Sequence, residues 1–139
     1  MDEQAARTWI ESLARTCGVQ QIRPHGRPYL DRYYAAGWQP ATRRAGPAIF
    51  LHHFLASDPD DAVHSHPWIW SASLIVCGGY RETRCKPGGG VDVREYRPGD
   101  VNVLAADDRH RIDLLAVDCW TVFLAGAFCQ PWRFDPVCR

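Results

Sequence analysis

The sequence lacks the features that would mark it for a membrane or a nucleic acid. No apolar stretch approaches the roughly 20 residues needed to span a bilayer, and the acidic, arginine-containing start MDEQAARTW does not resemble a signal peptide. The 16 basic and 16 acidic side chains balance without a long run of one sign, so electrostatics give nucleic-acid binding no support. We therefore expect a cytoplasmic protein with neither kind of partner.

The sequence also has no C-x-x-C pair. It contains six scattered cysteines, namely Cys17, Cys77, Cys85, Cys119, Cys129 and Cys138. Without a secretion signal, this number does not imply a disulfide framework, and we expect reduced, mostly buried thiols. Cys77 has a further interest because it lies on the same predicted strand run as two histidines, where a thiol can line a pocket.

The length of 139 residues, without internal repeats or linkers, predicts a single domain over 1–139. Residues 2–17 carry apolar side chains at helical spacing, with Asp2 as N-cap and Gly18 as stop, and predict one amphipathic helix. Most of the remainder, over about 29–130, predicts short strands separated by proline and glycine turns. The predicted strands are 29–34, 48–55, 62–66, 69–77, 80–85, 91–96, 101–104, 110–117 and 119–125. This spacing is typical of an antiparallel sandwich or barrel.

Two histidines one residue apart stand out in the stretch AVHSHPWIW. Successive side chains of a strand point to opposite faces, so His64 and His66 project together and Ser65 projects away. Two imidazoles need a third ligand to hold one ion, and His110 is the candidate because it follows a loop and opens the predicted strand HRIDLLAV. The H-x-H pair alone is weak evidence, since isolated histidines are usually surface or core residues.

The spacing around these histidines resembles two motifs of the cupin superfamily. In the first, HSH is followed by PWIW, then Ser71, then ASLIVC and Gly78. In the second, RPGDVNVLAADDRH places His110 eleven positions after Gly99. The string HSHPW with GGYRE also looks like that of small bacterial and phage cupins. The resemblance implies an all-β fold, the cupin double-stranded β-helix or jelly-roll barrel of six to eight strands, with one N-terminal α-helix and a metal inside the barrel.

The sequence departs from the first motif at Ser71, which stands where cupins usually have a glutamate ligand. This departure leaves His64, His66 and His110 as three neutral ligands around an ion with open positions. The arrangement resembles thiol dioxygenases and some diketone-cleaving dioxygenases, which also lack that glutamate. It implies one divalent transition metal, with Fe(II) favoured and Zn, Ni, Mn or Cu as alternatives.

The function implied by this resemblance is a mononuclear non-haem Fe(II) dioxygenase-like enzyme that uses O2 on a small polar or anionic substrate. Two alternatives stay open at this point. One is a non-catalytic cupin that binds a small ligand or metal as a sensor or accessory protein, and the other is a metal-dependent isomerase or lyase. Cupins often dimerise through an outer sheet, so a homodimer is also expected.

Further candidates come from residues near these motifs. Ser71, His53 and Glu82 are candidates for catalysis. For Glu82 an ion pair with an arginine such as Arg32 or Arg84 is favoured over metal ligation. Whether Glu82 or a water completes the metal shell stays open. Candidates for the substrate pocket are Trp70, Ser73, Cys77, Arg32, Tyr34 and Trp120. Ser71 and Ser73 share a face if the histidine alternation survives Pro67, and Trp68 and Trp70 serve either packing or substrate contact.

Overall fold

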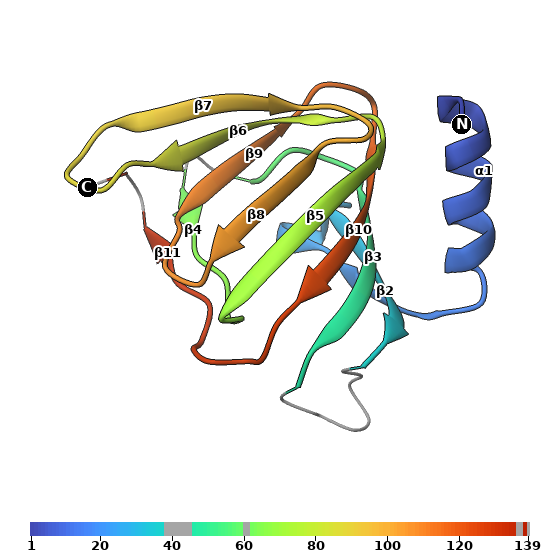
Figure 1. Ribbon diagram of the computed structural model, residues 1–139, viewed down its shortest axis with the longest axis horizontal. Helices are drawn as coiled ribbons and strands as arrows, with labels where there is room; N and C mark the ends of the chain where they lie inside the picture. The colour runs from blue at the N-terminus through green and yellow to red at the C-terminus, as the bar shows by residue number, and fades with distance from the viewer. Residues whose placement is uncertain (38–45, 60–61, 136–137, 139) are drawn as a thin grey trace.

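A computed structural model describes residues 1–37, 46–59, 62–135 and 138. These contain α1 (Glu3–Ala14), a short 3-10 helix (Pro24–Gly26) and the strands β1 (Gly18–Ile22), β2 (Leu30–Ala36), β3 (Ala48–Phe54), β4 (Val63–His64), β5 (Trp70–Cys77), β6 (Tyr80–Cys85), β7 (Val91–Tyr96), β8 (Val101–Ala105), β9 (His110–Leu114), β10 (Cys119–Ala125) and β11 (Phe134–Asp135). The strands form two antiparallel sheets, ordered β1-β2-β3-β10-β5-β8 and β11-β4-β9-β6-β7. Figure 1 shows these sheets facing each other, with α1 outside them. The predicted jelly-roll fold with one N-terminal helix is confirmed.

Each of the nine predicted strands has an observed counterpart, but the predictions missed β1 and β11. The sequence of β1, GVQQI, has no clear alternation, and its residues are mostly exposed because it forms the edge of its sheet. The two residues of β11 form a strand only because they pair with β4. β1 pairs with the next strand, β2, and β11 pairs with the distant β4, but neither has an apolar pattern of its own.

The helix begins as predicted and ends earlier. The Asp2 carboxylate accepts a hydrogen bond of 2.7 Å from the backbone N–H of Ala5, which caps the first turn. Helix α1 ends at Ala14, and Gly18 opens β1 instead of stopping the helix. No helix in the described part of the chain is long and apolar enough to cross a membrane.

The core of the described residues consists of three clusters. Outside the barrel, α1 packs on the six-stranded sheet through a cluster of Ile10, Ala14, Leu51, Val76, Cys77 and Trp120. Between the sheets, one end of the barrel is filled by Leu30, Phe54, Ile75, Tyr80, Tyr96, Ile112 and Cys119. A third cluster contains Tyr34, Ala48, Phe50, Trp68, Phe123 and Ala125. Two rings of this third cluster lie beside His66, with centroid distances of 6.3 Å for Trp68 and 6.4 Å for Phe123.

A β-bulge on β5 decides which residues face the barrel. Ile75 pairs with Thr121 on β10, whereas Cys77 pairs with Trp120, so Val76 is an extra residue on β5. Upstream of the bulge, β5 turns its buried serines and Ile75 inward. Beyond it, Cys77 and Trp120 both pack under α1. The expectation that Cys77 and Trp120 line the substrate pocket is therefore wrong.

Gly78, which ends the first motif, is required by the tight turn after β5. Its φ is +81°, and a Cβ built there would lie 2.1 Å from the backbone oxygen of Asp118. Only glycine adopts this conformation at such close approach without strain. The turn lets β6 start directly across the barrel from β5.

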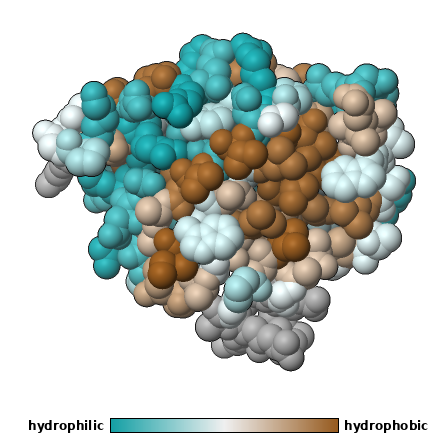
Figure 2. Space-filling view, viewed as in Figure 1, coloured by the Kyte–Doolittle hydropathy of each residue, from teal (hydrophilic) through white to brown (hydrophobic). Residues whose placement is uncertain are grey.

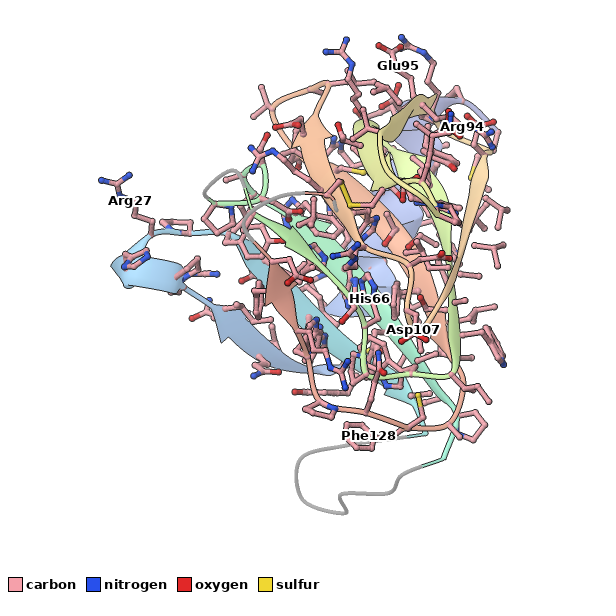
Figure 3. All side chains as sticks on the ribbon, turned by 90° about the vertical axis from the view of Figure 1, so that its left-hand side faces the viewer. Arg27, His66, Arg94, Glu95, Asp107 and Phe128 are labelled. Carbon is pink, nitrogen blue, oxygen red and sulfur yellow. A yellow bond between two sulfur atoms is a disulfide. The ribbon has the colours of Figure 1, made fainter. Side chains whose placement is uncertain are left out.

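The expectation that the cysteines are all reduced is corrected by a disulfide between Cys85 and Cys138. It joins the end of β6 to the C-terminal segment, across 53 residues of sequence. Figure 3 shows a yellow sulfur–sulfur bond of this kind among the side chains. The other four cysteines are free, and of these Cys129 is exposed. Sequence spacing alone could not pair Cys85 with Cys138, because their proximity comes from the return of the chain along β11.

Candidate metal centre

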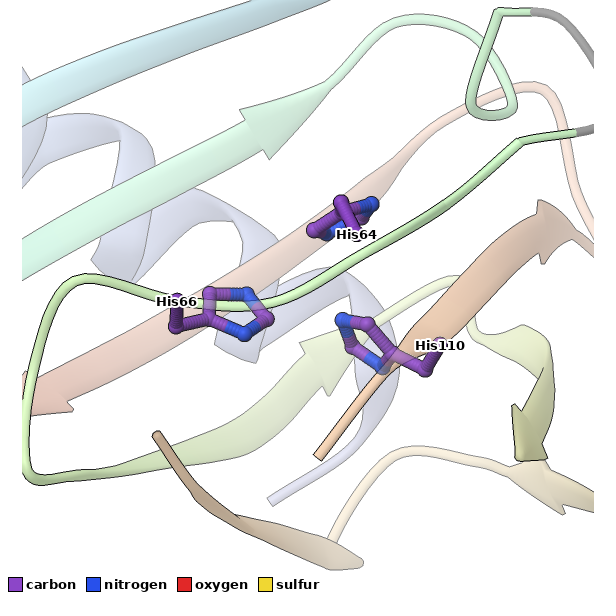
Figure 4. Close-up of side chains that lie close together, drawn as sticks. All are labelled: His64, His66 and His110. Atoms are coloured by element: carbon purple, nitrogen blue, oxygen red, sulfur yellow. The ribbon is translucent and has the colours of Figure 1, made fainter. Parts of the chain in front are cut away.

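Three histidine side chains converge between the two sheets. His64 on β4 pairs directly with His110 at the start of β9, and His66 follows two residues later. The centroids of the rings lie 4.7 Å apart for His64 and His110, 4.9 Å for His66 and His110, and 5.0 Å for His64 and His66. One nitrogen from each ring lies within 4.8 Å of the others. Figure 4 shows the three rings gathered around a common point.

The segment that carries His66 leaves the sheet after His64 and is held by other contacts. Ser65 donates its backbone N–H to the carbonyl of Arg133 at 3.0 Å. The Gln130 amide donates to the carbonyls of His66 and Ala106, at 3.0 and 2.9 Å. The C-terminal segment thus replaces the missing sheet partners, so that His66 keeps the inward direction that alternation gives it.

The electrostatics of the cluster suit metal ligation. Burial lowers the pKa of His64 to about 4 and that of His66 well below its ordinary value, with the neighbouring imidazoles also opposing protonation of His66. Both rings are therefore neutral at pH 7, as a metal ligand must be. The Nε2 of His110 is buried and has no hydrogen-bond partner within the described residues. A metal ion held by the three histidines would satisfy this nitrogen, so the residues fit the ion that the resemblance implies.

Glu82 lies behind His110 instead of facing the centre. Its Oε1 is 2.6 Å from the Nδ1 of His110, and its Oε2 is 3.0 Å from an amino nitrogen of Arg84. The Asn102 amide also donates to Oε1, at 2.9 Å. Burial raises the pKa of Glu82, but these hydrogen bonds outweigh it and hold the pKa at about 2. The ion pair with Arg84 is confirmed, and the carboxylate fixes the orientation of His110.

A second carboxylate that sequence reasoning missed stands beside His64. Asp58 is buried, with an oxygen 3.5 Å from the Nδ1 of His64. It accepts hydrogen bonds from the Tyr29 hydroxyl and from the backbone N–H of Ile112. The only sequence signal was its place in the turn SDPDD, which is typical of an exposed loop. Asp58 and Glu82 thus flank two of the three histidines.

The histidines open onto a cavity of about 420 Å³, a size typical of small-molecule sites. Its wall is mostly apolar and includes Ile22, Tyr29, Leu30, Phe54, Trp68, Tyr80, Leu104, Ile112, Phe123, Trp132 and Phe134. Arg32 and His52 line it as well, and the guanidinium Nε of Arg32 donates to the Nε2 of His52 at 3.1 Å. The wall residues Trp132 and Phe134 were also missed, because they lie beyond both motifs.

Some of the residues predicted for the substrate pocket line this cavity and others do not. Arg32 and Ser73 line the cavity. Ser71 is buried, but it is not on the cavity wall. Tyr34 packs in the aromatic cluster against Phe50 and donates its hydroxyl to Gln20 at 2.8 Å. Trp70 is 45% exposed on the outer face of β5.

The placement of Trp70 has a simple physical reason. His64, His66 and Trp68 all point inward, as alternation predicts, and Ser71 and Ser73 also point inward. The alternation therefore slips by one residue between Trp68 and Ser71, after the interruption at Pro67. Trp68 lines the cavity and Trp70 does not, which corrects the expected pocket.

His53 is also outside the cavity. Its ring stacks on Trp120 with centroids 4.0 Å apart, and its Nε2 lies 2.7 Å from an oxygen of Asp118. Asp118 in turn accepts two hydrogen bonds of 2.8 Å from Arg7 of α1. His53 thus helps to dock the helix, whereas its neighbour His52 faces the cavity. His53, a candidate for catalysis, thus lies outside the cavity, because adjacent strand residues face opposite sides.

No protein-family model and no curated protein sequence matches the chain. Several solved structures share its fold. Fe(II)-HppE with the alternative substrate (S)-1-HPP has a TM-score of 0.61 at 9% identity, over 81% of this chain and 57% of that chain. Streptomyces albus HEPD with 2-hydroxyethylphosphonate and Fe(II) bound has a TM-score of 0.62 at 13% identity, over 82% and 25%. Bacillus subtilis oxalate decarboxylase, described with Mn(II) centres, has a TM-score of 0.60 at 15% identity, over 82% and 29%.

These neighbours define the class of fold. The two antiparallel sheets form a jelly roll of the cupin type, the fold that these three structures share. The chain spans little more than half of HppE and less than a third of the other two. At this sequence identity the likeness establishes the fold alone, and the chemistry has to be argued from the site itself.

Proposed function

We propose that the protein is a mononuclear non-haem Fe(II) oxygenase of the dioxygenase type, acting on a small polar or anionic substrate. The observation that carries the proposal is the buried cluster of His64, His66 and His110 at the wall of a cavity of about 420 Å³. A ferrous ion in this cluster would supply redox chemistry with O2 and a positive charge for substrate binding. Zn, Ni, Mn and Cu are the alternatives that a metal analysis separates.

The surrounding residues support each part of this function. Glu82 fixes His110 from behind, and Asp58, which lies on the cavity wall, is 3.5 Å from the Nδ1 of His64. We propose that O2 and substrate approach the cluster from the cavity. Ser71 and Glu82 are not on the cavity wall, and we therefore propose the three histidines, without a carboxylate, as the ligand set. The apolar wall, with Trp68 and Phe123 close to His66, excludes water from the reacting groups.

The test is metal content followed by turnover. The protein is purified anaerobically, its metals are quantified with and without added Fe(II), and O2 uptake is measured with thiols, keto acids and aromatic diols. Stoichiometric iron and uptake with one class support the proposal. Absence of stoichiometric transition metal after Fe(II) addition refutes the site, whereas metal without O2 uptake for any class favours a non-catalytic binding protein or an isomerase or lyase.

His110→Ala tests the assignment of the third ligand. It removes the one ligand supplied by β9, so we expect the variant to lose metal retention. The matched control is His25→Asn, because His25 is exposed and its φ of +54° is tolerated by asparagine. The control should retain metal fully. Unchanged metal content in His110→Ala would show that the assignment is wrong.

A homodimer is the second part of the proposal. The outer face of the six-stranded sheet presents neighbouring apolar side chains, and Figure 2 shows them gathered over β8, β5 and β10. The exposed ones are Ile49, Trp70, Leu74, Val101, Val103 and Leu124. Contiguous apolar surface of this kind is typical of a protein interface, and the same face of a second copy would cover it. A cytoplasmic location stays a prediction that cell fractionation tests.

A further inference from the structure

Arg32 is a buried cation in the wall of the cavity. It lies on β2, is 6% exposed, and borders the same cavity as the three histidines. Burial lowers the pKa of Arg32 to about 10, so its guanidinium stays protonated at neutral pH. The cavity therefore carries a fixed positive charge before any metal or substrate binds.

This charge has no carboxylate partner among the described residues. None of the ion pairs there includes Arg32. Asp58, the acidic residue on the cavity wall, is engaged by Tyr29, by the Ile112 N–H and by His64. A buried charge without a counter-ion is costly, and an anion that enters the cavity removes that cost.

The guanidinium is held in a fixed orientation. Its Nε donates to His52, whose pKa is lowered well below its ordinary value by burial and by the Arg32 charge, so that His52 accepts as a neutral ring. The guanidinium carbon lies 5.2 Å from the ring centroid of Phe50, 5.7 Å from Trp68 and 5.4 Å from Trp132. These contacts leave the two terminal amino groups without a hydrogen-bond partner in the described structure. Two parallel N–H donors of this kind match the two oxygens of a carboxylate.

Arg32 and the histidine cluster share one wall of the cavity. Trp68 contacts both, since its ring lies 5.7 Å from the Arg32 guanidinium and 6.3 Å from the ring of His66. Phe123 links the same two regions, at 4.6 Å from His52 and 6.4 Å from His66. One small molecule can therefore reach Arg32 and the histidines together, with its body against aromatic rings.

We propose that Arg32 binds the carboxylate of a small monocarboxylate with an apolar body, and so orients this substrate toward the histidine cluster. The inference rests on the proposed function in one respect, since only an enzyme would use the bound carboxylate as a substrate. A monoanion is favoured because the wall offers one guanidinium with two free amino groups and no lysine. A phosphonate dianion needs more donors than this wall supplies.

The test uses two probes of the same shape, 3-phenylpropionate and its amide, 3-phenylpropanamide. Their dissociation constants are measured by calorimetry on the full chain loaded with Zn(II), which removes redox chemistry, and metal content is measured on the same samples. We expect the carboxylate to bind at least tenfold more tightly than the amide. Equal affinity for the two probes in the wild-type protein overturns the inference without any variant.

Arg32→Met then removes the charge and keeps a long apolar side chain against the rings. We expect it to abolish the preference for the carboxylate while metal content stays at the wild-type value. The control is Arg27→Met, because Arg27 is exposed and projects away from the barrel in Figure 3. A preference that survives Arg32→Met contradicts the inference, as does tighter binding of 2-phenylethylphosphonate than of 3-phenylpropionate.

The metal measurement separates the two proposals. A wild-type protein that holds no metal but shows a preference dependent on Arg32 refutes the metal centre and supports the anion site. A protein that holds metal but binds both probes equally refutes the anion site and leaves the metal centre standing.

Discussion

The Nδ1 of His110 lies 2.6 Å from the Oε1 of Glu82, and both side chains are almost fully buried. This contact directs the other nitrogen of His110, Nε2, toward the cavity side of the ring. A carboxylate behind a histidine fixes its tautomer and raises its strength as a ligand. Glu82 is thus a positioning residue for the candidate metal centre.

Glu82→Gln should weaken metal binding by roughly 10 to 100-fold, because the amide keeps the shape of the side chain but removes its charge. The dissociation constant is measured by competition with a chelator at pH 7. The control is Glu95→Gln on β7, where Glu95 forms exposed ion pairs with Arg81 and Arg97, and it should leave metal affinity unchanged. Equal affinities for wild type and Glu82→Gln would remove the positioning role.

The metal-free protein should lose stability as the pH falls from 7 to 5. The pKa of His64 is lowered to about 4 in the folded protein, so below its ordinary value of about 6.5 the unfolded chain binds more protons than the folded one. His64 alone then costs roughly 2 kcal/mol of the free energy of unfolding between these pH values. Buried His52 and His66 act in the same direction. Urea unfolding at the two pH values measures the loss.

The matched variants for this measurement are His64→Asn and His25→Asn. The first removes one of the buried titrating groups and should reduce the pH dependence by the His64 share of roughly 2 kcal/mol, whereas the second removes an exposed histidine and should not change it. A free energy of unfolding that is the same at pH 7 and pH 5 in the wild-type protein would contradict the neutral, buried state of the cluster.

Removal of the disulfide should destabilise the fold. Cys85 and Cys138 close a loop of 53 residues in sequence separation, for which chain entropy predicts a contribution of up to about 4 kcal/mol. Thermal unfolding of Cys138→Ser should show a lower midpoint than that of wild type. Cys129→Ser is the control, since Cys129 is free and exposed. If Cys138→Ser unfolds at the same midpoint as the wild type and Cys129→Ser, the disulfide does not stabilise the fold.

Val103→Glu should separate the proposed dimer into monomers. Val103 is 59% exposed on the apolar outer face of β8, and a charge there would be buried without a partner in the interface. Light scattering after size-exclusion chromatography measures the mass of wild type and variant. Val93→Glu is the control, because Val93 is similarly exposed but lies on β7 of the other sheet. A wild-type mass of one chain would rule out the dimer.

The predictable parts of this protein are those that rest on local pattern. Alternation within HSH predicted that His64 and His66 share one face, and the interval to His110 follows the cupin spacing. The structure brings these three residues together. The nine predicted strand segments were recognisable for the same reason, since each lies in a stretch of apolar and β-branched residues bounded by turn residues.

The errors came where alternation is interrupted. The slip after Pro67 put Trp68, and not Trp70, on the cavity wall, and the extra residue Val76 turned Cys77 toward α1. Pro67 marked a place where the alternation could slip, but it did not say which residues would then face the cavity. The extra residue Val76 has no local sequence signal, because it depends on pairing with β10. Asp58 and Trp132 were missed for a related reason, since only the return of distant segments places them at the site.

The disulfide at Cys85 also has a consequence for how activity is assayed. It ties β6 to the segment that follows Trp132 and Phe134, and these two side chains form part of the cavity wall. A thiol offered as a substrate, or added as a protective reagent, is at the same time a reductant of this bond. Turnover measured in thiol therefore reports on a cavity whose wall has lost its covalent anchor, and Cys138→Ser measured without thiol reproduces that condition.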